Sequence, residues 1–142
     1  MSGLKAFMKP PVTDTTEDVI ISDRFTDEDG KVQPFKIRII SQEINESLHN
    51  QASRPIKKNG VVIGSQTDST KYGNLLIVAC VVYPNFKDSE LCNYYKTKDP
   101  LDVPRRMLTA GEFSRLIKAV NRVNGFNIDD DQEKTLEEEA KN

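Results

Sequence analysis

Histidine and cysteine are scarce in this sequence, which contains one histidine, two cysteines and no tryptophan. Cys80 and Cys92 are twelve positions apart, so with His49 they do not form the ligand spacing of a zinc site. His49 lies on the polar side of a predicted helix, and we expect it to be solvent-exposed rather than an acid or base. Cys80 lies in an apolar run and is expected to be buried, whereas Cys92 lies in a polar segment and is expected to be exposed. We expect both thiols to be reduced.

Motifs for phosphate and calcium binding are also missing. The stretch 60–65 lacks the spacing and the lysine of a phosphate-binding loop. The acidic stretch 27–30 lacks the closing glutamate of a calcium loop, and 129–131 lacks its central glycine. The sequence therefore predicts no catalytic, cofactor-binding or metal-binding residue, and it favours a protein-binding role over an enzyme.

Long hydrophobic runs are absent as well. No stretch approaches the ~18 apolar residues that a membrane-spanning helix needs. The first apolar residues are interrupted by Lys9 and Pro10 before a signal-peptide core could develop. We therefore expect no membrane partner and a cytoplasmic location.

Charge is unevenly distributed along the chain. Residues 128–142 contain seven acidic residues and two lysines, a local net charge of −5, whereas the whole chain carries −2. Residues 1–127 are thus mildly basic at +3. This charge is too small and too mixed for a nucleic-acid footprint, and no nucleic-acid partner is predicted.

The length of 142 residues fits one domain. Two prolines, three threonines and three acidic residues in 9–18 indicate a flexible lead-in, so residues 1–17 are predicted as a flexible N-terminal segment. Residues 18–127 are predicted as the folded domain. Residues 128–142 are predicted as an acidic C-terminal tail that is disordered or weakly helical.

Alternation of apolar and polar residues predicts two β-hairpins. Strands over 19–25 and 35–39 flank the turn residues 27–31, in which Gly30 can adopt a positive φ without steric cost. The dipeptide Asn59-Gly60 precedes a β-branched run and is a strong signal for a second, smaller hairpin.

Capping residues and helical periodicity predict three helices. Ser41 is a plausible N-cap for a short helix over 42–52. Thr109 and Glu112 have the spacing of a capping box, which begins an amphipathic helix over 110–124.

The apolar run 75–83 is ambiguous. Its β-branched residues fit a buried strand, but Thr67 and Asp68 offer N-caps and Pro84 would end a helix, so a helix over 68–83 is favoured. Together these elements predict an α+β fold, a small single domain of antiparallel β-hairpins packed against about three helices. The predicted core consists of apolar residues from both hairpin strands and both long helices: Ile21, Phe25, Ile37, Ile39, Leu76, Ala79, Cys80, Val82, Phe113, Leu116, Ile117 and Val120.

Two groups of residues are candidates for partner binding. One is the amphipathic start of the chain, which could dock on its own domain, remain free or insert into a partner. The other is a set of cations near the last predicted helix, for which a solvated helix face is the simpler interpretation. The members are Leu4, Phe7 and Met8 in the first group and Arg105, Arg106, Arg115, Lys118 and Arg122 in the second.

A series of motifs resembles one known family across nearly the whole chain. These are Leu4-Lys5-Ala6-Phe7-Met8-Lys9, Arg24-Phe25, Asp27-Glu28-Asp29-Gly30-Lys31, Phe35-Lys36-Ile37-Arg38, Tyr83-Pro84, Asp88-Ser89-Glu90-Leu91, Met107-Leu108-Thr109-Ala110-Gly111-Glu112-Phe113, Val123-Asn124-Gly125-Phe126 and the ending Glu138-Glu139-Ala140-Lys141-Asn142. Their order resembles the XkdN-like tail assembly chaperones of phages, prophages and phage-tail-like particles of Gram-positive bacteria.

The resemblance implies a non-enzymatic assembly factor. It would bind the tape measure protein, keep it soluble and assist polymerisation of the tail tube, so the implied partners are the tape measure protein and the tail tube protein. It would act in the bacterial host cytoplasm, could form a homo-oligomer and would be absent from the mature particle. A longer frameshifted product is a further expectation from the resemblance. The alternative is a small structural component of the tail or baseplate.

Overall fold

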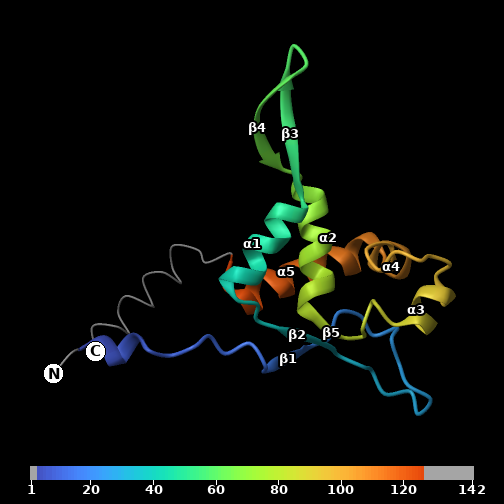
Figure 1. The fold of residues 1–142 in the computed structure, drawn as a ribbon. Helices are drawn as coiled ribbons and strands as arrows, with labels where there is room; N and C mark the ends of the chain where they lie inside the picture. The colour runs from blue at the N-terminus through green and yellow to red at the C-terminus, as the bar shows by residue number, and fades with distance from the viewer. Residues whose placement is uncertain (1–2, 127–142) are drawn as a thin grey trace.

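A three-stranded antiparallel sheet forms the base of the fold in a computed structural model that describes residues 3–126 (Figure 1). Its order is β1 (Thr16–Val19), β2 (Phe35–Arg38) and β5 (Val81–Tyr83). Val19 pairs with Phe35, and Ile37 pairs with Val81. Residues 16–18, at the end of the predicted lead-in, belong to β1, because β2 offers them a hydrogen-bonding edge that sequence composition does not reveal.

The loop between β1 and β2 has the predicted turn. Gly30 adopts a φ of 78°, and one carboxylate oxygen of Asp27 accepts hydrogen bonds from the backbone N–H groups of Asp29 and Lys31, each 2.9 Å long. The predicted strand over 19–25 is wrong except at Val19, because the strand that pairs with β2 spans Thr16–Val19; Ile21 beyond it is nevertheless buried.

Three helices cover the sheet, and their starts confirm the predicted caps. Helix α1 (Gln42–Gln51) is capped by Ser41, α2 (Ser69–Cys80) by Asp68, and α5 (Ala110–Asn124) by the Thr109–Glu112 capping box. Gly125 ends α5 with a φ of 73°. Helix α2 packs against both α1 and α5, and α5 packs against β2.

Two shorter elements were not predicted. Helices α3 (Ser89–Tyr94) and α4 (Asp102–Met107) follow the sheet and lie on the side of the molecule away from the N-terminus (Figure 1). Each has six residues, too few for a clear apolar periodicity in the sequence. The mixed helix and antiparallel-sheet content nevertheless confirms the predicted α+β class.

The predicted helix over 68–83 is too long by three residues. Residues 81–83 form β5, because pairing with β2 satisfies backbone groups that the helix end leaves open. Strand alternation then turns Val81 inward and leaves Val82 45% exposed, so the prediction of Val82 as core is wrong. The prediction of Ile39 as core is also wrong, because its side chain is 39% exposed. Strand β2 ends at Arg38, and the chain then turns so that Ile40 is buried instead.

All ten other predicted core residues lie in one apolar cluster. Six are buried (Ile21, Ile37, Leu76, Cys80, Leu116 and Val120), and four are partly buried against it (Phe25, Ala79, Phe113 and Ile117). Asn124 closes the cluster at the end of α5. Its side chain accepts a 2.9 Å hydrogen bond from the N–H of Ile40 and donates one of 3.0 Å to the carbonyl of Val120.

Candidate functional site

A two-stranded ribbon, here called the arm (residues 53–67), is the most exposed feature of the fold. It consists of β3 (Ser53–Lys58) and β4 (Val61–Thr67), joined by the predicted Asn59-Gly60 turn with φ angles of 53° and 79°. Figure 1 shows it extending away from the ends of α1 and α2. Every residue of both strands is exposed, so the arm presents two faces and two edges to its surroundings.

The base of the arm is held by the helices on either side. Ala52, at the end of α1, is 1% exposed, and its carbonyl accepts a 2.8 Å hydrogen bond from the N–H of Asp68, the N-cap of α2. Because α1 and α2 pack together, this hydrogen bond fixes where the arm leaves the domain. The arm is therefore an extension built on a rigid base.

The chemistry of the arm combines apolar and cationic side chains. Val61, Val62 and Ile63 are 63%, 59% and 61% exposed. The arm also carries Arg54 and two neighbouring lysines at 57–58 and contains no acidic residue, giving a net charge of +3. Exposed β-branched side chains on an open edge are suited to pairing with another chain. The sequence predicted this hairpin but not its exposure, since the same residues could have packed on the domain.

The start of the chain also exposes apolar side chains. The N-terminal segment (residues 3–9) contains a short 3-10 helix, η1 (Gly3–Phe7). Leu4, Phe7 and Met8, the predicted partner-binding residues here, are 58%, 83% and 65% exposed.

The predicted cations do not form one unengaged cluster. Arg115 donates a 3.0 Å hydrogen bond to the carbonyl of Ile21, and Arg122 forms a 2.7 Å ion pair with Glu17. Both arginines thus tie α5 to the segment around β1. Lys118 lies on the same helix and is exposed.

The other two predicted cations lie in the last turn of α4 (Asp102–Met107). Arg105 pairs with Asp102, and Arg106 donates hydrogen bonds of 3.0 and 2.9 Å to the carbonyls of Tyr95 and Lys96. Arg105 also borders an open cavity of about 650 Å³ between α2 and α5, beside Phe113.

The ion pair between Arg24 and the largely buried Glu112 was not predicted. Both guanidinium nitrogens of Arg24 that face Glu112 lie 2.8 Å from its carboxylate oxygens, and Arg24 also contacts the carbonyl of Met107. Glu112 is 5% exposed, and the Arg24 guanidinium holds the pKa of this carboxyl far below its ordinary value. The capping-box motif identified Glu112 as structural, but nothing local indicated a partner 88 positions away.

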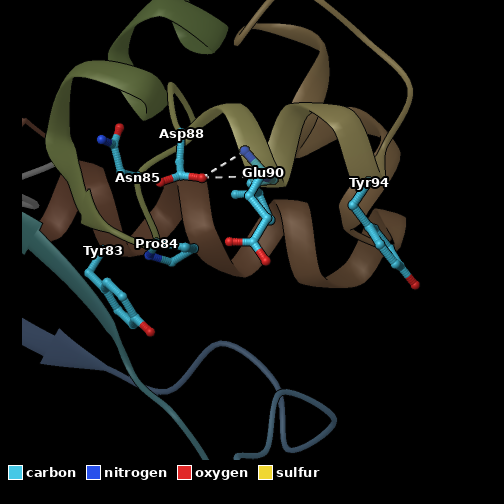
Figure 2. A pocket seen from close by; sticks show the side chains of 7 residues that line it. Tyr83, Pro84, Asn85, Asp88, Glu90 and Tyr94 are labelled. Carbon is cyan, nitrogen blue, oxygen red and sulfur yellow. Dashed lines mark hydrogen bonds between the residues drawn. The ribbon is translucent and has the colours of Figure 1, made fainter.

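A second open cavity, here called the α3 hollow, has a volume of about 540 Å³. Figure 2 shows Tyr83, Pro84 and Tyr94 around it, with the carboxylate of Glu90 between the two tyrosines. Leu91, Asn85 and Asp88 complete the lining. The hollow thus combines aromatic and apolar walls with acidic side chains.

Both cysteine thiols are buried, and the histidine ring packs against a tyrosine. Burial raises the pKa of the Cys80 thiol to about 11. The expected exposure of Cys92 is wrong: it is 8% exposed because α3 turns it inward, and its thiol donates a 3.3 Å hydrogen bond to the carbonyl of Phe86. His49 is half-buried rather than fully solvated, with its ring stacked 4.0 Å from that of Tyr72.

Residues 3–126 present neither a cluster of metal ligands nor a membrane-spanning helix. These residues contain no group of three or more His, Cys, Asp or Glu side chains that could hold a metal ion. None of the helices formed by the same residues is both long enough and apolar enough to cross a membrane. The predicted acidic tail, 128–142, lies outside the described residues.

Comparisons with known proteins give a consistent result. Residues 4–141 match the family described as phage XkdN-like tail assembly chaperone protein. YqbN, an uncharacterized protein of Bacillus subtilis (strain 168), is 39% identical over 96% of this chain and 92% of its own. The phage-like element PBSX protein XkdN of the same strain is 35% identical, over 96% of this chain and 93% of its own. A crystal structure of YqbN aligns with a TM-score of 0.69 and 31% identity, over 86% of this chain and 96% of that one.

Proposed function

Because this chain belongs to the phage XkdN-like tail assembly chaperone family, we propose that it binds the tape measure protein, keeps it soluble and assists polymerisation of the tail tube around it. The family assignment makes it a tail assembly chaperone. The identity of its partners and its action on them are the proposal.

The exposed arm is the observation that supports client binding. A solitary two-stranded ribbon is marginally stable in water, and exposed Val61, Val62 and Ile63 add no burial to it. Covering these side chains would remove apolar surface from water, which stabilises a complex by roughly 25 cal/mol for each Å² buried. A client with apolar segments therefore gains affinity from the same surface that is unfavourable in the free chaperone.

The N-terminal segment and the cations extend this surface in the proposal. Leu4, Phe7 and Met8 would contribute apolar contacts to the client. The cations would contribute weaker contacts, because those with intramolecular partners are already engaged. The engaged cations are Arg105, Arg106, Arg115 and Arg122. All four are exposed, as is Lys118.

A chaperone acts before the particle is complete. We therefore place the protein in the cytoplasm of the bacterial host and expect it to be absent from the mature particle. Self-association into a homo-oligomer is compatible with this role and is developed below. A structural subunit of the tail or baseplate would instead persist in purified particles.

Co-expression with the tape measure protein tests the proposal. We expect the full chain to render the tape measure protein soluble and to co-purify with it. The double variant Val61→Ser/Ile63→Ser removes the apolar character of the arm at positions 63% and 61% exposed. Val12→Ser/Ile20→Ser is the matched control, because those residues are 61% and 63% exposed but lie outside the arm.

The possible outcomes distinguish a chaperone that binds through the arm, a chaperone that binds elsewhere and a structural subunit. Loss of co-purification in the arm variant, with retention in the control, supports the arm as the client-binding surface. Equal retention in both would reject the arm, although not the chaperone. A tape measure protein that stays insoluble with the unaltered chain, together with detection of this chain in finished particles, would replace the chaperone with the structural subunit.

A further inference from the structure

The N-terminal segment and the α3 hollow have complementary surfaces. The segment (residues 3–9) carries exposed Phe7 and Met8 together with Lys5 and Lys9, and it contains no acidic residue. The hollow has apolar walls and acidic side chains, and none of its seven lining residues is basic.

The hollow is open to a ligand that is both apolar and cationic. Tyr83 and Tyr94, at 53% and 76% exposed, offer two aromatic faces to an incoming apolar side chain or cation. The carboxylate of Asp88 is occupied in capping α3, where it accepts hydrogen bonds from the N–H groups of Glu90 and Leu91 (Figure 2). The side chain of Glu90 is therefore the acid available to an incoming lysine.

The segment of the same chain points away from the hollow. Thr16 pairs with Arg38, whereas Tyr83 at the hollow pairs with Lys36 of the same strand. The chain preceding Thr16 thus leaves the sheet at the end farther from Tyr83. Figure 1 accordingly shows η1 on one side of the molecule and α3 on the opposite side. Docking between the two surfaces is consequently expected between copies rather than within one.

We propose that the N-terminal segment of one copy docks in the α3 hollow of a second copy. Phe7 and Met8 would contact the tyrosines, while Lys5 or Lys9 would lie beside Glu90. Because the two surfaces differ, the contact is heterologous and extends head to tail until it closes into a ring or is interrupted. It covers the most exposed aromatic side chain of the described residues, Phe7 at 83%, while no client is bound.

Sedimentation of the purified full chain, without any client, tests this contact separately from the proposed chaperone role. We expect a mass that rises with protein concentration and falls with added salt. Phe7→Ala should weaken self-association at least about tenfold, because a desolvated aromatic anchor is a typical hot spot. Glu90→Lys should weaken it through charge repulsion. Glu28→Lys is the control, since it reverses an exposed acid in the loop between β1 and β2.

A mixing experiment gives the sharper result. Phe7→Ala retains an intact hollow and Glu90→Lys retains an intact segment, so an equimolar mixture should form a heterodimer at a protein concentration at which each variant alone sediments as a monomer. If Glu90→Lys changes the circular dichroism spectrum, Tyr94→Ser replaces it as the hollow variant.

Three results would overturn the proposal. The first is an unaltered chain that remains monomeric across the whole concentration series. The second is a variant of either surface that associates like the unaltered chain. The third is a mixture of the two variants that stays monomeric.

Discussion

Replacement of Arg24 by methionine tests the ion pair that joins the loop after β1 to the start of α5. Methionine retains an apolar stem but removes both guanidinium hydrogen bonds to Glu112, each 2.8 Å long. The Glu112 side chain is 6% exposed and keeps only weaker partners, among them the N–H of Thr109 at 2.9 Å. The variant therefore leaves a nearly buried carboxylate without its charge partner.

The magnitude follows from the unequal exposure of the two partners. Breaking a fully buried pair costs about 3–5 kcal/mol, whereas exposed pairs contribute about 0–1 kcal/mol. The Arg24 side chain is 46% exposed, so solvent screens part of the interaction. We expect Arg24→Met to lower the free energy of unfolding by about 1–3 kcal/mol in urea titrations at pH 7.

The matched control is Arg122→Met. Its partner is Glu17, and the two side chains are 57% and 49% exposed, so the cost should stay below about 1 kcal/mol. An Arg24→Met variant no less stable than Arg122→Met would refute the reasoning, because it would mean that burial of Glu112 adds nothing.

The pH dependence provides a second check of the same pair. Arg24 lowers the pKa of Glu112 in the folded state, whereas a glutamate in the unfolded chain has a pKa of about 4.3. The stabilisation by the pair is thus fully present above about pH 5 and is lost as pH falls toward the lowered pKa. The difference between the unaltered chain and Arg24→Met should be constant from neutral pH to about pH 5 and should narrow below about pH 4. A difference that persists undiminished in acid would point to lost packing rather than lost charge.

Three further predictions concern the core, a helix cap and the thiols. Leu116→Ala should lower the free energy of unfolding by ~2–5 kcal/mol because Leu116 is 0% exposed. Val62→Ala on the exposed arm should change it by less than about 0.5 kcal/mol. Urea titrations check both values, provided that the slope of the unfolding free energy against urea concentration is the same for each variant. Thr109→Ala removes the N-cap of α5 and should cost about 0.5–2 kcal/mol in the same assay, and no measurable loss would contradict the capping role. The thiols of Cys80 and Cys92 are buried. A thiol reagent at pH 8 should therefore react with both cysteines in denaturant, and with neither in the folded protein over the same time. Rapid reaction of the folded protein would contradict this and would show that the core opens readily.

The arm illustrates how a correct local prediction can miss the exposure of an element. Asn59-Gly60 specified the turn, and the φ angles of 53° and 79° confirm it. Whether Val61–Ile63 would then pack on the domain or face solvent depends on the space around the ribbon. Helices α1 and α2 pack against each other, whereas among the described elements the two strands of the arm make their main contacts with one another.

The sequence by itself determined the features that depend on neighbours a few positions away. The capping box at Thr109, the left-handed Gly125 and the turn at Gly30 each arise from backbone groups that local residues satisfy. The order of short motifs along the chain was likewise sufficient to indicate the family. Amphipathic periodicity located Leu116 in the core for the same reason, because a helix fixes which side chains share a face.

Tertiary structure alone decided what depends on distant segments. Residues 81–83 became a strand because β2 lay beside them, Glu112 gained its charge partner from the loop after β1, and Cys92 was buried by the turn of α3. Each outcome balances burial and hydrogen bonding between segments tens of residues apart, and no local pattern records which segments will meet. The arm and the α3 hollow belong to this second class, since exposure is a property of the assembled surface rather than of any single segment.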